Sequence, residues 1–234
     1  MAVVLNVEGI SSGYGDSMVI RDLSFSLGAS ESLAILGKNG MGKSTLLKSI
    51  MGYLPKKQGG ITLLGTDITS CSPHRIASLG MTYAAQEQAL FTELSVYDNL
   101  SLGLEHKNLF PLRFKEILPL FPVFENRLHQ RAGTLSGGEQ KMLLVARSLM
   151  MHPEVMLLDE ITEGLQPSVI ARLADALVWE RRRHGTAMLI IEQNIPFALK
   201  VSDRFMILKK GEFVDSGRSD EPGAADKVFH HLIV

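Results

Sequence analysis

Several features are scarce in this sequence of 234 residues, and each absence excludes a class of protein. There is one cysteine, Cys71, so no internal disulfide can form and the chain suits a reducing compartment. Lys and Arg total 24 against 25 Asp and Glu, and this balance argues against a partner that is nucleic acid or acidic lipid. No apolar run approaches the roughly 20 residues that span a bilayer, and the N-terminus lacks the pattern of a signal peptide. We therefore expect a soluble protein.

The residues that are present are typical of a globular α/β protein. Apolar residues make up 45% of the chain and charged residues 21%, which is close to the usual globular mixture. Short apolar runs alternate with helical patterns, and this favours a sheet covered by helices. The expected strands are 3–7, 23–27, 33–36, 61–64, 81–84, 155–158, 188–191 and 205–208. The expected helices begin at Gly42, Ser72, Ser95, Gly137, Ser168 and Ile195, with the serines at 72, 95 and 168 as caps.

The strand pattern fades between residues 90 and 134, where prolines interrupt pieces compatible with helix. We therefore predict one domain with a mainly helical insert. Residues 1–89 and 152–234 form its core and a β subdomain, and residues 90–151 form the helical part. The tail at 217–225 is expected to be a loop, followed by a short helix or strand at 227–234.

A glycine-rich segment follows the predicted strand 33–36 and precedes a predicted helix. It reads Gly37-Lys38-Asn39-Gly40-Met41-Gly42-Lys43-Ser44-Thr45, which satisfies the phosphate-loop pattern. Glycines let backbone amides approach an anion, and the helix start directs its N–H groups to the same place. Lys43 can neutralise the β- and γ-phosphates, and the Ser44 hydroxyl can ligate Mg²⁺. A chance glycine-rich turn is the alternative, but strand, loop and helix occur here in the required order.

Two carboxylates, Asp159 and Glu160, follow the apolar strand 155–158. Parallel sheets bind ligands at the carboxyl ends of their strands, which is where these acids fall. Asp159 is predicted to hold Mg²⁺, and Glu160 to orient or deprotonate the attacking water. A strand that simply enters solvent at an acidic turn is the alternative.

A second glycine motif, Leu135-Ser136-Gly137-Gly138-Glu139-Gln140-Lys141, precedes a strongly helical run. Ser136 is a suitable helix cap, and the two glycines keep the helix start open for an anion. With this motif between the phosphate loop and the acidic strand, essentially the whole chain resembles the ATP-binding subunits of ABC transporters.

The resemblance implies roles for further residues and a mixed-sheet P-loop ATPase fold with an antiparallel β subdomain. Tyr14, in Ser-Gly-Tyr-Gly, matches the aromatic residue that stacks on adenine, and Gln86 matches the glutamine that senses Mg²⁺ and water. It also implies a dimer in which Ser136, Gly137 and Gly138 contact the nucleotide on the phosphate loop of the other subunit. Asn39, Gly40, Gly42 and Thr45 would complete the nucleotide site.

The sequence departs from the family at three positions. Gln193 stands at the usual histidine, Ile161 at the usual proline and Gln166 at the common aspartate. Gln193 can donate a hydrogen bond to the γ-phosphate but cannot carry a proton. The segments Glu-Gln-Asn, Leu-Ser-Gly-Gly-Glu-Gln-Lys-Met and Thr-Glu-Gly-Leu-Gln-Pro resemble one branch, the bacterial importers of branched-chain amino acids, amides and urea. Within it, Glu-Gly-Leu-Gln-Pro and the terminal His-His-Leu-Ile-Val favour the urea or amide members.

The resemblance implies an importer ATPase at the cytoplasmic face of the bacterial inner membrane. Its partners would be a second ATPase subunit or a second copy, two integral-membrane permeases and, indirectly, an external solute-binding protein. Gln193 and Gln166 motivate an alternative, a subunit that binds ATP but hydrolyses it poorly. A soluble, non-transport ABC protein is a third possibility.

Two remaining clusters have ordinary explanations. The basic run at residues 181–184 lies at the C-terminal end of a predicted helix, where the negative end of the helix dipole stabilises cations. We therefore interpret the run as a solvated helix terminus and not as a nucleic-acid-binding patch. His230 and His231 project differently and have no evident further ligands, so we interpret them as surface residues and predict no metal pair there.

Overall fold

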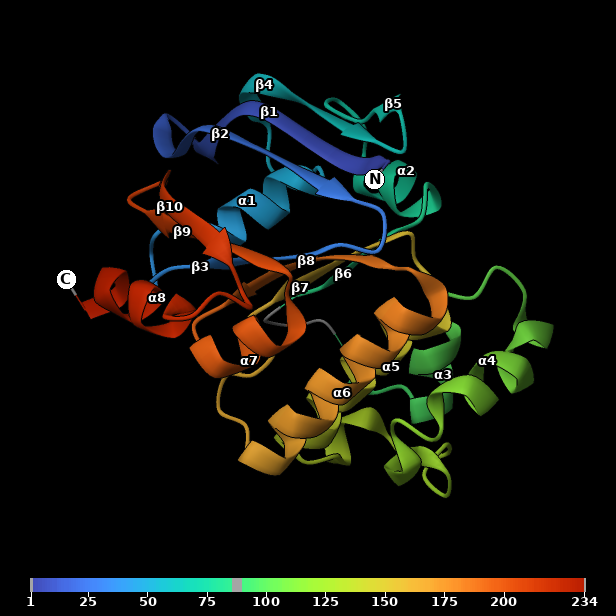
Figure 1. Ribbon diagram of the computed structural model, residues 1–234. Coiled ribbons are helices and arrows are strands. Elements are labelled where there is room, and N and C mark those ends of the chain that lie inside the picture. The colour runs from blue at the N-terminus through green and yellow to red at the C-terminus, as the bar shows by residue number, and fades with distance from the viewer. Residues whose placement is uncertain (1, 86–89, 234) are drawn as a thin grey trace.

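The computed structural model describes residues 2–85 and 90–233, and two sheets dominate it (Figure 1). The larger sheet has six strands in the order β10-β9-β3-β8-β7-β6. All neighbours are parallel except β10, which runs antiparallel to β9. Its strands are β3 (Ser32–Leu36), β6 (Met81–Ala84), β7 (Val155–Asp159), β8 (Ala187–Glu192), β9 (Arg204–Lys209) and β10 (Glu212–Arg218).

The second sheet is antiparallel, with the order β2-β1-β4-β5. Its strands are β1 (Val3–Tyr14), β2 (Ser17–Gly28), β4 (Lys56–Leu63) and β5 (Thr66–Asp67). Helix α1 (Lys43–Ile50) lies between the two sheets, and its Leu46, Leu47 and Ile50 share a core with residues of both. Burial on both faces of the six-stranded sheet explains the nearly continuous apolar runs of its central strands.

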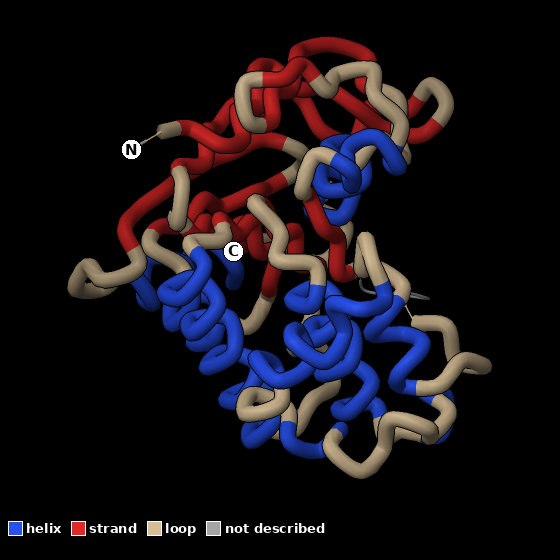
Figure 2. Tube along the Cα trace, turned by 90° about the vertical axis from the view of Figure 1, so that its right-hand side faces the viewer, coloured by secondary structure: helices blue, strands red, loops and turns tan. Residues whose placement is uncertain are grey.

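The other helices gather on the opposite face of the six-stranded sheet, away from the antiparallel sheet, as Figure 2 shows, except for α2. Met156, Leu158, Met188 and Ile190 pack into the helical core on that face, while their strand neighbours face α1. The helices on that face are α3 (Val96–Ser101), α4 (Phe110–Ile117), α5 (Gly137–Met150), α6 (Pro167–His184), α7 (Ile195–Val201) and α8 (Ala224–Ile233), whereas α2 (Pro73–Ser78) shares the core of α1. Short 3₁₀ helices span Lys107–Leu109, Pro122–Phe124 and Ala132–Thr134.

The predicted fold class is confirmed, and each expected strand lies within or overlaps an observed one. Helices α3, α4 and α5 fall within residues 90–151, where the helical part was expected; the division into subdomains stays a prediction. No helix in the described ranges is long and apolar enough to cross a membrane.

Three details of the predicted elements were wrong. Ser168 does not cap α6, because Pro167 takes the first helical position and Gln166 precedes it without a side-chain cap. Residues 217–218 belong to β10, which pairs with β9 at the edge of the sheet and is not the predicted loop. The residues of β10 are exposed or half-buried, so the sequence lacks the apolar run that would have indicated a strand. Helix α8 begins at Ala224, three residues earlier than the predicted 227.

The turn between β9 and β10 contacts both β2 and the phosphate loop. Gly211 N donates to Met41 O (3.1 Å), and Gly211 O accepts from Arg21 N (2.9 Å). Gly211 has a φ of +84°, and a Cβ there would lie 2.1 Å from Val19 O. Glycine is therefore required for both the conformation and the close approach.

We predict that Gly211→Ala lowers the free energy of unfolding by roughly 2 to 5 kcal/mol, because a left-handed alanine is strained and its methyl group collides with the β2 backbone. Gly223→Ala is the matched control, since Gly223 has a φ of +82° and nothing within 4 Å of its Cβ position. The control should lose only about 1 to 2 kcal/mol. Equal losses in urea denaturation would contradict the importance of the contact with Val19.

Candidate functional site

The predicted phosphate and carboxylate residues meet because their strands are neighbours. Strand β3, which leads into the glycine loop, pairs with β8, and β8 pairs with β7. Leu36 is opposite Glu192 and Ile191 is opposite Asp159, so the three parallel strands end at one edge of the sheet. Ligand sites in open α/β sheets lie at this edge.

Gly37 and Gly42 of the loop leave no room for a side chain, so both positions require glycine. A Cβ at Gly37 would lie 2.5 Å from Leu208 O, and one at Gly42 would lie 2.8 Å from Ile20 Cγ2. Gly42, with a φ of 101°, precedes α1, and Gly40 also has a positive φ, +79°. The loop thus turns tightly between β2 and β9, directly before the helix N-terminus, as anion binding requires.

Lys43 is buried at the first position of α1. Its Nζ donates to Gly37 O (2.8 Å) and Lys38 O (3.0 Å), and forms an ion pair with Glu160 Oε1 at 2.9 Å. Both side chains of the pair are about one-twentieth exposed or less, at 3% and 5%. The φ of Glu160 is +47°, a costly conformation outside glycine, and such strain clusters at functional sites.

Asp159 accepts two hydrogen bonds beside this pair. Ser44 Oγ donates to its Oδ1 (3.1 Å), and Tyr83 OH from β6 donates to its Oδ2 (2.9 Å). Burial raises the pKa of Asp159, while the hydrogen bonds from Tyr83 and Ser44 oppose that rise. A hydroxyl and a carboxylate in contact are the oxygen donors that Mg²⁺ prefers, so the residues present fit this ion.

Sequence reasoning missed Tyr83, whose position inside an apolar strand gave no signal of a polar partner. Burial, followed by the charge of Asp159, raises the pKa of Tyr83, so this phenol is neutral and remains a donor. Tyr83 therefore orients the carboxylate that was predicted to hold Mg²⁺.

Glu192 at the end of β8 was also missed as a site residue. Its buried carboxylate accepts from Thr162 N (3.0 Å) and Thr162 Oγ1 (2.7 Å), and thereby fixes the loop after Glu160. Its neighbour Gln193 donates from Nε2 to Asn39 Oδ1 at 2.6 Å. Gln193, the residue after β8, therefore contacts the glycine loop although it lies 154 residues from Asn39 in the sequence.

The comparisons with known proteins agree with this geometry. The family model described as ABC transporter matches residues 20–163, which include the loop, both carboxylates and the second glycine motif. The chain belongs to the ABC transporter family.

Relatives of this ABC protein include both importers and an exporter. It is 33% identical to the branched-chain amino acid transport ATP-binding protein BraG of Pseudomonas aeruginosa, over 90% of this chain and 91% of that one. It is also 33% identical to a probable branched-chain amino acid transport protein, LivF of Archaeoglobus fulgidus, covering 93% of each chain. The lipopolysaccharide export ATP-binding protein LptB of Haemophilus influenzae is 31% identical, covering 93% and 92%.

Solved structures share the fold. An ATP-binding subunit of an ABC transporter has a TM-score of 0.87 at 24% identity, covering 99% of this chain and all of that one. A bacterial ABC transporter cassette solved as a dimer has a TM-score of 0.83 at 19% identity, covering 93% and 100%. Family and fold are those of ATPases whose hydrolysis of ATP is coupled to transport, which confirms the predicted enzyme class.

The second glycine motif of the ABC protein begins α5. Ser136 caps the helix by accepting from Glu139 N, and Glu139 Oε2 accepts from Ser136 N in return. Arg127 pairs with Glu139 at 2.8 Å, which braces the cap. A Cβ at Gly137 would meet nothing within 4 Å, so the tip of α5 is open to an approaching group.

The remaining predicted nucleotide contacts are placed as follows. Tyr14 ends β1 and is 49% exposed, so its ring is accessible for stacking. Thr45 is buried in the first turn of α1, where its carbonyl accepts from Ser49 Oγ. Gln86 lies outside the described residues. The roles of all these residues stay predictions.

We predict that Tyr83→Phe raises the Mg²⁺ concentration needed for half-maximal ATPase activity by about 10-fold, because the loss of a supporting hydrogen bond weakens a metal carboxylate. Mg²⁺ titration at fixed ATP measures the effect. Tyr53, exposed beside Tyr83 with ring centroids 6.2 Å apart, supplies the control variant Tyr53→Phe. If both variants behave like the wild type, Tyr83 does not support the site.

Proposed function

We propose that this ABC ATPase powers a bacterial importer of branched-chain amino acids or of related amides and urea. The observation that carries the proposal is the match to BraG and LivF, each over at least nine-tenths of both chains. The departures at Gln193 and Gln166 support the same branch. The match to LptB, an export protein, covers as much of this chain, at 93%, so the proposed solute depends on the branch assignment.

The proposed assembly follows from the family. Two integral-membrane permeases carry the solute, an external binding protein delivers it, and the ATPase works peripherally at the cytoplasmic face of the inner membrane. A second ATPase subunit or a second copy completes the site, in line with the dimeric cassette of the same fold. Ser136, Gly137 and Gly138 at the open tip of α5 would contact the nucleotide held by the other subunit.

Within the site, the loop amides and Lys43 bind the phosphates of ATP. Ser44, Asp159 and Gln86 would hold Mg²⁺, which would supply positive charge beside the phosphates. The ion pair of Lys43 with Glu160 suggests how the two functions are linked. A γ-phosphate attracts the Lys43 ammonium, and this frees the Glu160 carboxylate to accept a proton from the attacking water. Gln193 positions the γ-phosphate. Its hydrogen bond to Asn39 holds the Gln193 side chain beside the glycine loop.

We predict that Glu160→Gln lowers the rate of ATP hydrolysis by about 10²- to 10⁴-fold and leaves ATP affinity within about a factor of a few, because the base is lost while an amide oxygen still accepts from Lys43. Glu105→Gln, at a side chain that is 85% exposed, is the matched control. Phosphate release and ATP titration are measured on both. Near-normal turnover of Glu160→Gln would remove Glu160 from the role of base.

A subunit that binds ATP but hydrolyses it poorly remains the second candidate, favoured by the neutral Gln193 beside the loop. Single-turnover hydrolysis by a reconstituted pair, with only this chain's Glu160 replaced, separates the candidates. A large loss supports the hydrolytic role; full retained activity supports the second candidate.

The solute is tested by deleting the gene and measuring uptake of labelled leucine, acetamide, urea and molybdate. We expect loss of uptake of one of the first three, restored by the wild-type gene and not by Glu160→Gln. Loss of molybdate uptake alone, or of lipopolysaccharide export, would refute the importer branch proposed.

A further inference from the structure

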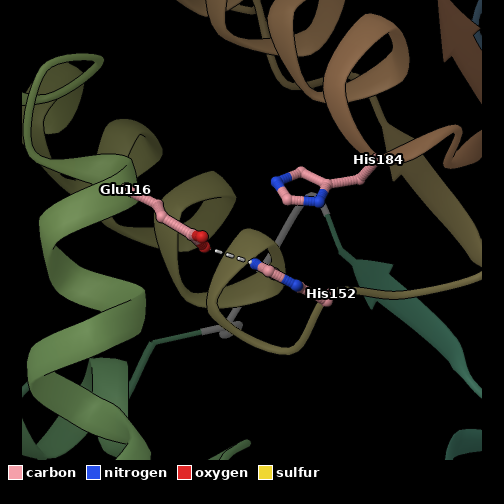
Figure 3. Close-up of side chains that lie close together, drawn as sticks. All are labelled: Glu116, His152 and His184. Atoms are coloured by element: carbon pink, nitrogen blue, oxygen red, sulfur yellow. Dashed lines mark hydrogen bonds and ion pairs between the residues drawn. The ribbon is translucent and has the colours of Figure 1, made fainter.

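Three potential metal ligands, Glu116, His152 and His184, lie close together, as Figure 3 shows. Glu116 is in the last turn of α4, His152 follows α5, and His184 ends α6. None of them belongs to the nucleotide site. Three separate segments thus direct one carboxylate and two imidazoles toward a common point.

The donor atoms are close enough to share an ion. One ligand atom from each residue lies within 4.8 Å of those of the other two. Glu116 Oε2 is 2.8 Å from His152 Nε2, and the rings of His152 and His184 have centroids 4.1 Å apart. The three side chains are 30%, 21% and 20% exposed, so they are largely held in place but remain accessible to an ion from solvent.

We propose that Glu116, His152 and His184 form a binding site for a divalent transition metal of the zinc class. Two imidazoles and one carboxylate are a ligand set that suits Zn²⁺ and its neighbours and is poorly suited to Mg²⁺ or Ca²⁺. The fourth position is left to water.

A buried carboxylate behind His184 supplies the outer support that metal-ligating histidines usually have. His184 Nε2 has no hydrogen-bond partner in the described part of the chain and lies 4.0 Å from Glu180 Oε2. Glu180 is 1% exposed, and its other oxygen accepts from Thr186 Oγ1 at 2.8 Å. A small shift of the ring lets one nitrogen donate to Glu180 and turns the other toward the ion.

The guanidinium group of Arg113 occupies part of the proposed metal position. Arg113, one turn before Glu116 on α4, contacts the His152 imidazole and lies 3.8 Å from Glu116 Oε2. An arriving divalent ion would repel its guanidinium, which can move into the adjoining cleft lined by Leu109, Met151 and Pro153. Metal binding is therefore an exchange of one cation for another, and it joins α4 to the C-terminal end of α6.

The test is calorimetric titration of the full chain with Zn²⁺ in the absence of nucleotide. We expect one ion per chain, and a rise of the thermal midpoint by about 5 to 10 °C at a metal concentration about 100 times Kd. Co²⁺ should give the visible absorption of a low-symmetry nitrogen and oxygen site. Absence of binding at micromolar Zn²⁺ would overturn the proposal.

Glu116→Gln and His152→Asn remove one ligand each with little change of shape, and asparagine tolerates the φ of +46° at position 152. Each should weaken Zn²⁺ binding by at least about 10-fold, while the midpoint without metal and the affinity for ATP confirm folding. His106→Gln, at a side chain that is 70% exposed, should leave binding unchanged. Equal losses in all three variants would overturn the site.

Arg113→Gln tests the exchange. It should tighten Zn²⁺ binding by roughly 30-fold, which corresponds to the repulsion between a divalent ion and a unit charge about 4 Å away in water. Unchanged or weaker binding would overturn the placement of the ion at the position that Arg113 holds.

Discussion

The ion pair between Lys43 and Glu160 is the interaction on which the rest of the site depends. It joins the start of α1 to the end of β7 at 2.9 Å, in surroundings from which water is almost excluded. Removing one partner of such a pair leaves an uncompensated buried charge, at a cost of about 3 to 5 kcal/mol. A phosphate group could take the lysine away from the glutamate without that cost, which is the basis of the link proposed above between nucleotide binding and the Glu160 carboxylate.

The sheet supplies the frame for this pair. Strands β3, β8, β7 and β6 are consecutive neighbours, and each contributes one component near its carboxyl end: the glycine loop, Glu192 with Gln193, the two carboxylates, and Tyr83. Hydrogen bonds between distant residues then fix the details. Glu192 orders Thr162 in the loop after Glu160, and Gln193 reaches Asn39. The segment that carries Glu160 is therefore held from both its own strand and the neighbouring one.

The helical side of the molecule has a second polar cluster, which is built from different residue types. Glu116, His152 and His184 come from segments that no sequence motif connects, and the cluster joins α4 to α6 where both end. In the predicted nucleotide site, Lys43 and Glu160 pair between two sequence motifs. In the cluster, Arg113 provides a positive charge that the proposed metal would replace. The two sites would thus respond to different ligands in one small chain.

The sequence by itself determined the family, the fold class and the phosphate loop. These features are local in the sequence. The glycines, Lys43 and Ser44 lie within one short segment, and the apolar strand that ends in Asp159 and Glu160 can be recognised without knowing which strands pair with it. Most strand and helix positions followed from the same local patterns. Edge strand β10 did not, because its half-exposed residues lack an apolar run and only pairing with β9 makes it a strand.

Tertiary structure alone decided which distant residues meet. Tyr83 and Asp159 are 76 residues apart, Asn39 and Gln193 are 154 apart, and Glu116 meets two histidines from other segments of the chain. Nothing in a single sequence marks such pairs, since their contact follows from strand order and helix packing. The residue types set what chemistry is possible, and the packing of the two sheets and the helices against one another selects which of those possibilities come within bonding distance.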